Sequence, residues 1–331
     1  MAQPNGHATP LTTRELSAMT GVAVDAVELA LGPEGIVPLT SATIGATADG
    51  VRRFLEQRGV VYRPRIVAHI TMRGGTGKTT ATISAAVRAA QYGFKVCILD
   101  LDPQGSSTLA FDAAPEEGDP IFYDVWQNPR ELIPDALKTV RENLALLPSS
   151  LENALLDASL INPGSQKKAV REVCEALKAC GYDAIIIDCP PSLGIAVIST
   201  VCAVDTAVIP VGSDAFSIRG LEITLSEIAS IRDTFGLPMP EIRILYSRHD
   251  RREKISGDML DSLRRRYGHL PLTVIGTSSE FSKALAAGNT VFSSFRKSQA
   301  RDDYDRYVRD VFGMGRTGGD ALPQDVPSPQ K

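Results

Sequence analysis

The sequence predicts a doubly wound α/β domain, in which a mainly parallel sheet carries helices on both faces, together with a small helical N-terminal segment. Three observations predict this class. From residue 65 onward, short β-branched and apolar runs alternate with stretches of helical character. The runs are continuously apolar, which is typical of strands buried on both faces of a parallel sheet. A glycine-rich loop also stands between the first strand and the first long helix, where α/β domains bind phosphate.

The N-terminal part of the chain has a different character. Residues 1–10 are polar and are predicted to be disordered, whereas residues 11–63 are predicted to form a helical segment. Two short helices, "TTRELSAMTG" and "VAVDAVELAL", are expected on either side of Gly21, with Thr12 or Thr13 capping the first. A further helix is expected in "ADGVRRFLEQRG".

Three interpretations of residues 11–63 remain open. Two short helices joined by a Thr-Gly turn resemble a helix-turn-helix, which would suit specific operator binding. The same segment would suit dimerisation or docking of a partner. It would also suit an inert extension.

Residues 64–313 are predicted to form the α/β domain. Its expected strands are the apolar runs "RIVAHIT", "KVCILD", "LALLP", "DAIIID", "TAVIPV", "IRILYS" and "LTVI". Its expected helices are "KTTATISAAVRAAQYG" and residues 166–180, 193–203, 215–235 and 298–312. Residues 314–331 are rich in Gly and Pro and are predicted to form a disordered tail.

Composition limits the functional classes. The net charge of −4 is not that of a protein that binds nucleic acid over its whole surface, so any DNA contact must come from a local patch. Five cysteines without a CxxC pair are expected to be reduced, buried thiols in the cytosol. Neither a signal peptide nor a transmembrane stretch is expected, so the chain is predicted to be cytoplasmic.

The stretch "MRGGTGKTT", residues 72–80, has the spacing of a phosphate-binding loop. Backbone N–H groups of such a loop and of the following helix point at one place and favour an anion there. Lys78 is expected to reach the β and γ phosphates of ATP, and Thr79 to offer its hydroxyl to Mg²⁺. The nucleotide-binding set is predicted to be Arg73, Gly74, Gly75, Thr76, Gly77, Lys78, Thr79 and Thr80.

Acidic residues end two further predicted strands. "YDAIIIDCPPS" ends its strand at Asp188, which is predicted to serve Mg²⁺ directly or through water. "VCILDLDPQGSS" ends its strand at Asp100 and Asp102. Asp100 suits a structural role, whereas Asp102 is predicted to orient a water on the γ-phosphate. The carboxyl ends of these two strands and of the strand before the phosphate-binding loop are expected to lie at the edge at which such sheets bind ligands.

The motifs "RGGTGKTT", "VCILDLDPQGSSTL" and "YDAIIIDCPPSLG" together resemble the ParA/Soj family of partition ATPases, in the deviant Walker A class of P-loop proteins. "ENLALLPSSLENALLD" and "IPVGSDAFSIRGLEIT" extend the resemblance, which covers about residues 65–312. It implies an ATP- and Mg²⁺-dependent homodimer that binds nonspecific DNA of the nucleoid. It further implies slow hydrolysis that a ParB-like or cargo-adaptor protein stimulates, and the positioning of plasmid, chromosome or protein cargo.

The resemblance also implies individual roles. Lys78 and Asp102 fall on catalytic positions, Thr79 and Asp188 on Mg²⁺ positions, and Arg73 on the signature lysine that crosses the dimer interface to the partner's phosphates. Arginine keeps the charge but is longer and forked. Three interpretations of Arg73 remain: a working contact in trans, a site that binds ATP but hydrolyses it poorly, and a side chain that faces solvent.

A local basic stretch is the candidate DNA surface. Residues 243–266 hold eight Lys/Arg and four Asp/Glu, a net charge of +4. The resemblance places Arg252 on a DNA-contacting arginine, but Glu280 stands where relatives have a basic residue. A solvated helix face is the alternative. The predicted DNA-binding set is Arg219, Arg251, Arg252, Lys254 and Lys283.

Two other functions are weighed against the ATPase switch. A transcriptional regulator would use residues 11–63 to bind DNA and ATP only as a ligand. A membrane-bound switch would need a terminal amphipathic basic helix, and the Gly/Pro-rich tail argues against one. The sequence does not name the cargo or the activating partner.

Overall fold

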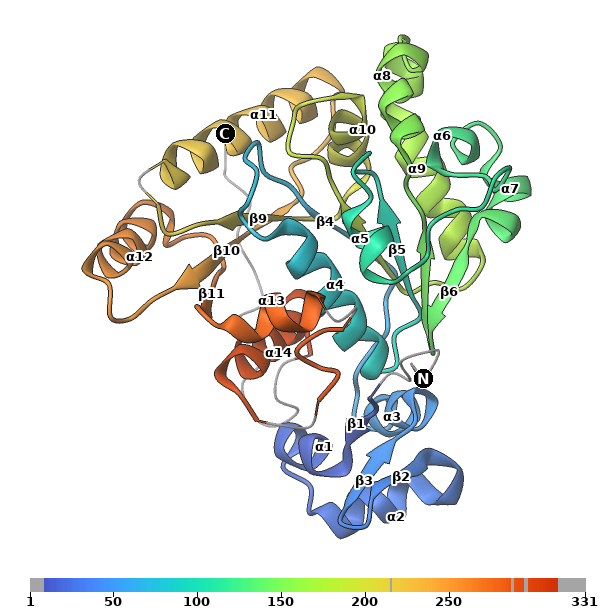
Figure 1. The fold of residues 1–331 in the computed structure, drawn as a ribbon, viewed down its shortest axis with the longest axis vertical. Helices are drawn as coiled ribbons and strands as arrows, with labels where there is room; N and C mark the ends of the chain where they lie inside the picture. Colours follow the sequence, from blue (N-terminus) through green and yellow to red (C-terminus); the bar gives the residue numbers. More distant parts are fainter. Residues whose placement is uncertain (1–8, 215, 287–288, 295–296, 315–331) are drawn as a thin grey trace, which may run out of the picture.

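A computed structural model describes residues 9–214, 216–286, 289–294 and 297–314 of the chain. The predicted disorder of residues 1–10 and 314–331 therefore falls mainly on residues outside this description. Figure 1 shows a large twisted sheet flanked by helices, with a smaller N-terminal module at one end of the molecule. Over the described residues, no helix combines the length and the apolar character that crossing a membrane requires.

The large sheet has eight strands in the order β11-β10-β9-β4-β8-β5-β7-β6. Every neighbouring pair is parallel except β6 and β7, which are antiparallel. This confirms the predicted mainly parallel, doubly wound sheet. The strands are β4 (Arg65–His69), β5 (Val96–Asp100), β6 (Lys138–Arg141), β7 (Leu144–Leu147), β8 (Ala184–Asp188), β9 (Thr206–Val211), β10 (Glu241–His249) and β11 (Leu272–Gly276).

Two cores lie on the two faces of this sheet, because successive strand residues point to opposite sides. Ile66 and Ala68 belong to the core that α9 to α12 cover, whereas Val67 belongs to the core under α4 and α14. The helices and the 3₁₀ helix η1 are α4 (Lys78–Gln91), α5 (Ser106–Ala110), α6 (Phe122–Val125), α7 (Pro129–Ala136), η1 (Leu151–Leu155), α8 (Leu156–Ser159), α9 (Pro163–Ala179), α10 (Ile195–Ala203), α11 (Ser217–Thr234), α12 (Lys254–Tyr267), α13 (Ser279–Ala286) and α14 (Gln299–Val311).

The N-terminal module is more than the helical segment that the sequence predicts. Its three expected helices are present as α1 (Thr13–Thr20), α2 (Val24–Gly35) and α3 (Ala48–Glu56). A small antiparallel sheet in the order β1-β3-β2 joins them, built from β1 (Leu11–Thr12), β2 (Ile36–Thr40) and β3 (Thr43–Ala46). Thr12 caps α1 and forms a capping box with Glu15, and Gly21 ends α1 with φ of 74°. The sequence reasoning missed the hairpin because its strands are short and half-exposed.

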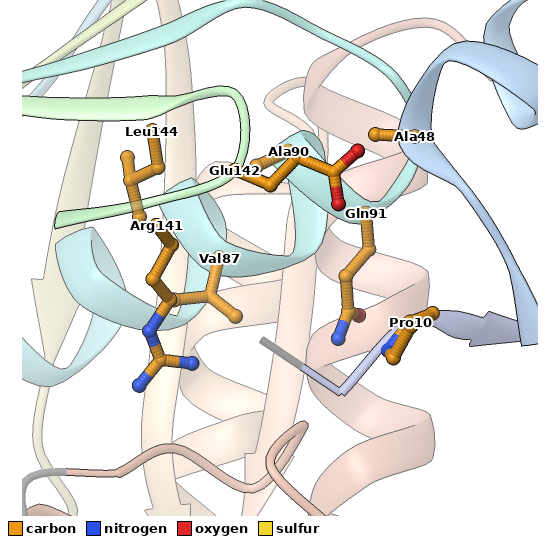
Figure 2. A pocket seen from close by; sticks show the side chains of 8 residues that line it. All are labelled: Pro10, Ala48, Val87, Ala90, Gln91, Arg141, Glu142 and Leu144. Carbon is orange, nitrogen blue, oxygen red and sulfur yellow. The ribbon is translucent and has the colours of Figure 1, made fainter. Parts of the chain in front are cut away.

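The module is joined to the α/β domain by a close-packed seam. Figure 2 shows Pro10 and Ala48 of the module facing α4 and the turn between β6 and β7. The cavity they line has a volume of about 20 Å³, enough for no more than one water molecule. Tyr62 also donates a hydrogen bond to the carbonyl oxygen of Tyr92 at 2.7 Å.

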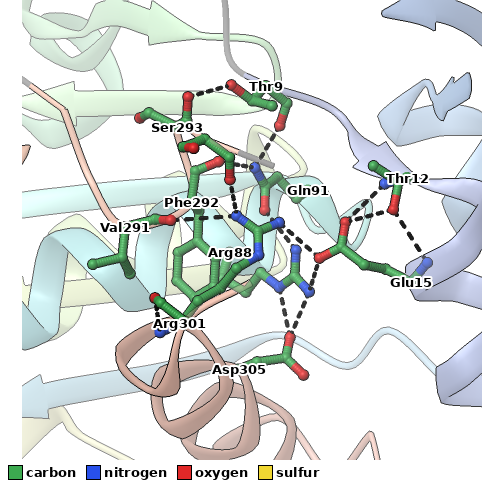
Figure 3. Close-up of polar contacts among 12 residues, drawn as sticks. Thr9, Thr12, Glu15, Arg88, Gln91, Val291, Phe292, Ser293, Arg301 and Asp305 are labelled. Carbon is green, nitrogen blue, oxygen red and sulfur yellow. Dashed lines mark hydrogen bonds and ion pairs between the residues drawn. The ribbon is translucent and has the colours of Figure 1, made fainter. Parts of the chain in front are cut away.

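A buried charge network crosses the same seam (Figure 3). Glu15 Oε1 lies 3.0 Å from Arg88 of α4 and 2.7 Å from Arg301 of α14. Arg88 also pairs with Asp305 at 2.6 Å and is only 3% exposed. Burial alone would raise the pKa of Glu15, but Arg88 and Arg301 outweigh it and lower that pKa to about 2. The network therefore fixes the module to both helices.

The cysteines differ in one respect from the expectation. All five are free, and Cys97, Cys174, Cys189 and Cys202 are buried as predicted. Cys180 is exposed, because it follows the last turn of α9 at the protein surface.

His69 is buried at the end of β4, and its two ring nitrogens contact hydroxyl groups. One lies 2.6 Å from the oxygen of Tyr307 and the other 2.9 Å from that of Thr82. Burial, together with the charge of Lys78, lowers the pKa of His69 to about 3. The folded protein therefore keeps this ring neutral at a pH at which an unfolded histidine is protonated.

Acid should therefore weaken folding through His69. The unfolded histidine has the higher pKa, so its contribution to stability is complete above about pH 6.5 and declines as the pH falls toward 3. We expect the wild type to lose about 2 kcal/mol more unfolding free energy than His69→Gln between about pH 7.5 and pH 5. Urea denaturation at the two pH values measures this difference, and the comparison cancels the contribution of shared carboxylates. Equal losses in the two proteins would contradict it.

Candidate nucleotide-binding site

The predicted phosphate-binding loop connects β4 to α4 at the carboxyl edge of the sheet. Gly75 and Gly77 have φ of 74° and 91°, conformations that glycine adopts without the strain of a side chain. A Cβ atom added to Gly74 or Gly75 would meet nothing within 4 Å, so the space before the loop is open. The first amides of α4, which begins at Lys78, face this space with the positive end of the helix dipole.

Lys78 is held over the loop. Its Nζ donates a hydrogen bond to the carbonyl oxygen of Arg73 at 3.2 Å, and only 8% of the residue is exposed. Burial lowers the pKa of Lys78, and the charges of Asp188 and Asp102 partly offset this. An ammonium group with this little access to water is well placed to pair with a phosphate.

Asp188 and Asp100 lie side by side because β8 and β5 pair them in register. The Oδ2 atom of Asp188 accepts a hydrogen bond from Ser107 at 2.7 Å, and Thr108 donates to Asp100 from both its amide and its hydroxyl at 2.8 Å. Burial raises the pKa of both carboxyl groups, and the charge of Asp188 raises that of Asp100 further. The two carboxyl groups therefore lie close together in a buried place where negative charge is costly unless a cation offsets it.

The donor set fits Mg²⁺ at Asp188. Its Oδ1 atom is buried and has no hydrogen-bond partner among the residues that the structure describes. The side chain of Thr79 faces the same carboxylate and lowers its pKa. A carboxylate and a hydroxyl oxygen at the mouth of a phosphate loop are ligands that suit Mg²⁺. Asp100 uses its oxygens within the protein, as expected for a structural role.

Asp102 stands one step further out, where the chain leaves β5. Its Oδ1 accepts a hydrogen bond from the amide of Gln104 at 3.0 Å, and its carbonyl accepts one from Ser149 at 2.7 Å. The residue is half-exposed. These bonds hold Asp102 at the carboxyl edge, and its role as a catalytic residue stays a prediction.

Arg73 lies at the rim of the loop and is engaged within its own chain. Its Nη1 pairs with Asp214 and donates to Ser217 Oγ at 3.2 Å. The exposed ring of Phe216 lies beneath its guanidinium, which is 5.9 Å from the ring centre. Sequence reasoning missed Asp214 and Ser217, although an Asp just before a predicted helix and a Ser in its first turn are a signal of helix-start residues. The contact in trans stays a prediction.

A cavity of about 560 Å³ adjoins the loop. It is lined by Gly77, Thr80, the end of β10 at Ser247 and Arg248, and the segment after β11 at Thr277 and Ser278. Its position beside Gly77 places it next to the phosphate loop, on the side of α13.

The predicted DNA-binding residues come from three elements and are exposed. Arg251 and Arg252 lie in the turn before α12, and Lys254 is the first residue of that helix; Arg219 lies at the start of α11 and Lys283 on α13. Arg252 pairs with Asp250 at 2.7 Å. Glu222 binds both Arg219, at 3.4 Å, and Arg266, at 3.1 Å, and so joins the start of α11 to the end of α12. Glu280 lies exposed on α13, near Lys283 in sequence.

Comparisons with known proteins agree with this geometry. A family profile described as "AAA domain" matches residues 64–240. The chain is 30% identical to an uncharacterized Mycobacterium tuberculosis protein, over 76% of this chain and 80% of that protein. It is 26% identical to the sporulation initiation inhibitor protein Soj of Bacillus subtilis, over 76% of this chain and 99% of Soj.

Solved structures with a similar fold include nucleotide-bound proteins. Cobyrinic acid a,c-diamide synthase from Mycobacterium smegmatis, solved with a bound ATP analog and magnesium, is 25% identical, with a TM-score of 0.63 over 75% of this chain and 94% of that one. An ATP complex of a Cyanothece McdA variant is 21% identical, with a TM-score of 0.68 over 79% of this chain and 99% of that one. The likeness to McdA shows the shared fold.

Ser107 should control Mg²⁺ affinity through its hydrogen bond to Asp188. Loss of a hydrogen bond that orients a metal-ligating carboxylate weakens metal binding roughly tenfold or more. We expect Ser107→Ala to raise the Mg²⁺ concentration that half-saturates the ATP-bound protein by about that factor. Titration of Mg²⁺ against a fluorescent ATP analogue measures it. Ser106→Ala, an exposed neighbour on the same helix, is the matched control. Equal Mg²⁺ affinities for Ser107→Ala and wild type would contradict the role of Ser107 in orienting Asp188 toward Mg²⁺.

Proposed function

The chain belongs to the ParA/Soj family of P-loop ATPases, and we propose that it acts as an ATP-dependent dimer switch. In the proposed cycle, ATP joins two subunits, the dimer binds nonspecific DNA of the nucleoid in the cytoplasm, and hydrolysis releases it. A ParB-like or cargo-adaptor protein stimulates the slow hydrolysis. The cycle positions or segregates plasmid, chromosome or protein cargo.

One observation carries this proposal. The phosphate loop, the buried ammonium group of Lys78 and the ends of β5 and β8 meet at one edge of the sheet. This is the edge at which doubly wound sheets bind ligands. The combination suits a nucleoside triphosphate with its metal. The backbone amides and the ammonium group of Lys78 suit the phosphates, and the oxygens of Thr79 and Asp188 suit the metal.

The roles of individual residues follow from their positions. Lys78 and the loop amides would bind the β and γ phosphates, while Thr79 and Asp188 would hold Mg²⁺. When bound, Mg²⁺ neutralises charge that develops on the phosphate oxygens. Asp102 would orient the attacking water from its place at the rim. The cavity next to Gly77 is the proposed place of the adenine base, and Thr277 and Ser278 would stand beside it.

Arg73 is proposed to contact the partner subunit's phosphates. Its position at the rim, about one-third exposed, leaves the guanidinium accessible from outside the subunit. A planar guanidinium can bind two phosphate oxygens at once. Asp214 and Ser217 hold the guanidinium of Arg73 in the free subunit. When the dimer closes, this guanidinium would have to release Asp214, or contact Asp214 and the partner subunit's phosphate at the same time.

DNA is proposed to bind the exposed cations of α11, α12 and α13. The set is Arg219, Arg251, Arg252, Lys254 and Lys283. Because the chain is acidic overall, contact with phosphate must be confined to this region. Ion pairs with Asp250 and Glu222 occupy Arg252 and Arg219, so DNA would compete with these carboxylates.

Substitution of Arg73 tests the dimer switch. In an Asp102→Ala background, which should trap ATP, Arg73→Lys is expected to retain ATP-dependent dimerisation. Arg73→Ala should raise the dimer dissociation constant by roughly tenfold or more, because a charged hydrogen bond to phosphate is lost. Light scattering after size-exclusion chromatography, with ATP and with ADP, measures this. Arg264→Ala, another exposed arginine, serves as control. If Arg73→Ala dimerises normally in this background and also hydrolyses ATP normally in the chain that keeps Asp102, the trans role is refuted.

Salt dependence tests the DNA surface. Each phosphate contact that is removed should lower the slope of log affinity against log salt by about one. We expect Arg251→Ala and Arg252→Ala to reduce this slope for ATP-bound protein on random-sequence duplex, without a change in ATP binding. Fluorescence anisotropy over a salt series measures it, and Arg53→Ala, exposed on α3, is the control. Unchanged slopes in both variants would remove α12 from the DNA surface.

A further inference from the structure

The outer face of α2 is an apolar surface that the described structure leaves uncovered. Val27 and Leu31 on its inner side are 0% and 6% exposed and fill the core of the module. On the outer side, Ala26, Leu29 and Ala30 follow helical spacing and are all exposed, with Leu29 at 85%. Contiguous exposed apolar residues, unlike single ones, mark interaction surfaces. This face is therefore a candidate contact surface for a second molecule.

DNA does not suit this face, although two short helices joined by a turn at Gly21 resemble a helix-turn-helix in sequence. The second helix of that motif enters the major groove and must donate hydrogen bonds to base edges and phosphates. From Ala23 to Gly35 the sequence is "AVDAVELALGPEG", which contains no side-chain donor and no cation. Its charged residues are Asp25, Glu28 and Glu34, which a phosphate backbone repels.

The acidic residues frame the apolar face. Glu28 is used internally, because it accepts a hydrogen bond from Thr13 at 2.8 Å. Asp25 and Glu34 are exposed at the two ends of α2. Eight residues lie between them, and the helix is broken before Glu34 at Gly32, which has φ of 68° and ψ of 176°. The surface is thus an apolar stripe with a negative charge at each end.

A second copy of the chain would fit this surface poorly. Two α2 helices packed antiparallel about a twofold axis through Leu29 and Ala30 would bring Asp25 of each subunit toward the segment after Gly32 of the other, which carries Glu34. A parallel arrangement would place like residues together. Both arrangements bring carboxylates together at each end of the stripe, which costs affinity.

We infer that the outer face of α2 binds a helix of a partner protein, in which a seam of apolar side chains is flanked at both ends by Lys or Arg. The small side chains of Ala26 and Ala30 allow close approach beside Leu29, and the flanking cations would pair with Asp25 and Glu34. The inference is independent of the nucleotide switch, because α2 lies at the far end of the molecule from α11 in Figure 1.

The module is a fixed platform for this partner. Its helix α1 is tied to α4 and α14 through Glu15, and Arg52 of α3 pairs with Asp183 at 2.5 Å. The outer face of α2 points away from these contacts. A partner would therefore find a preformed surface and lose little conformational entropy on the side of this chain.

Photo-crosslinking tests the inference in the native host. A benzophenone side chain placed at Ala30 of the full chain should crosslink to one protein segment, whose sequence is read by mass spectrometry. The expected segment is helical in pattern, with an apolar seam and Lys or Arg at both ends. The synthetic segment should bind the wild-type chain about tenfold more tightly than Leu29→Ala, and about tenfold more tightly than Asp25→Lys/Glu34→Lys at low salt.

Each other outcome overturns the inference. A crosslink to this same chain would make the face a dimer contact, and a crosslink to DNA would restore the DNA-binding interpretation. An acidic or uncharged segment, binding that ignores the three substitutions, or no crosslink would also refute it. ATP hydrolysis by the same variants should equal that of wild type. This checks folding and separates failure here from failure of the proposed switch.

Discussion

The register among β4, β8 and β5 is the constraint on which the nucleotide site depends. Parallel pairing places His69 opposite Asp188 and Asp188 opposite Asp100, so three strands end at the same level. A shift of one residue would turn each of these side chains to the other face of the sheet. The buried apolar residues that precede them on both faces hold the register. The site is thus assembled by the same packing that builds the two cores.

Helix α4 connects this edge to the opposite end of the domain. It begins at Lys78 in the phosphate loop and ends at Gln91, after Arg88 has entered the charge network with Glu15 and Asp305. A buried arginine is costly to leave unpaired, so its carboxylate partners are held to it. The N-terminal module is therefore part of the framework of the ATPase domain, although its sequence carries none of the ATPase motifs.

Much of the fold and of the phosphate loop was predictable, because the sequence signals were local. All seven expected strands are present, since continuous apolar runs identify buried parallel strands. Strand β6 was missed because its sequence, "KTVR", is mostly polar. The contact of Arg73 with Asp214 was missed for another reason, since 141 residues separate the two and only the folded chain joins them. The acidic, donor-free character of α2 was readable from sequence, but its exposure was not.

The antiparallel edge strand β6 affects the tendency of the protein to aggregate at high concentration. An open edge of a parallel sheet offers unpaired backbone groups to any neighbouring chain and invites aggregation. Here β6 closes that edge with four residues that include Lys138 and Arg141. The opposite edge strand, β11, ends under α14, where Asp303 accepts a hydrogen bond from the amide of Gly276 at 2.9 Å. Both edges of the sheet thus disfavour pairing with a strand of another molecule. At high local concentration, contacts between copies of the chain are therefore expected to form through side chains and not through the sheet edges.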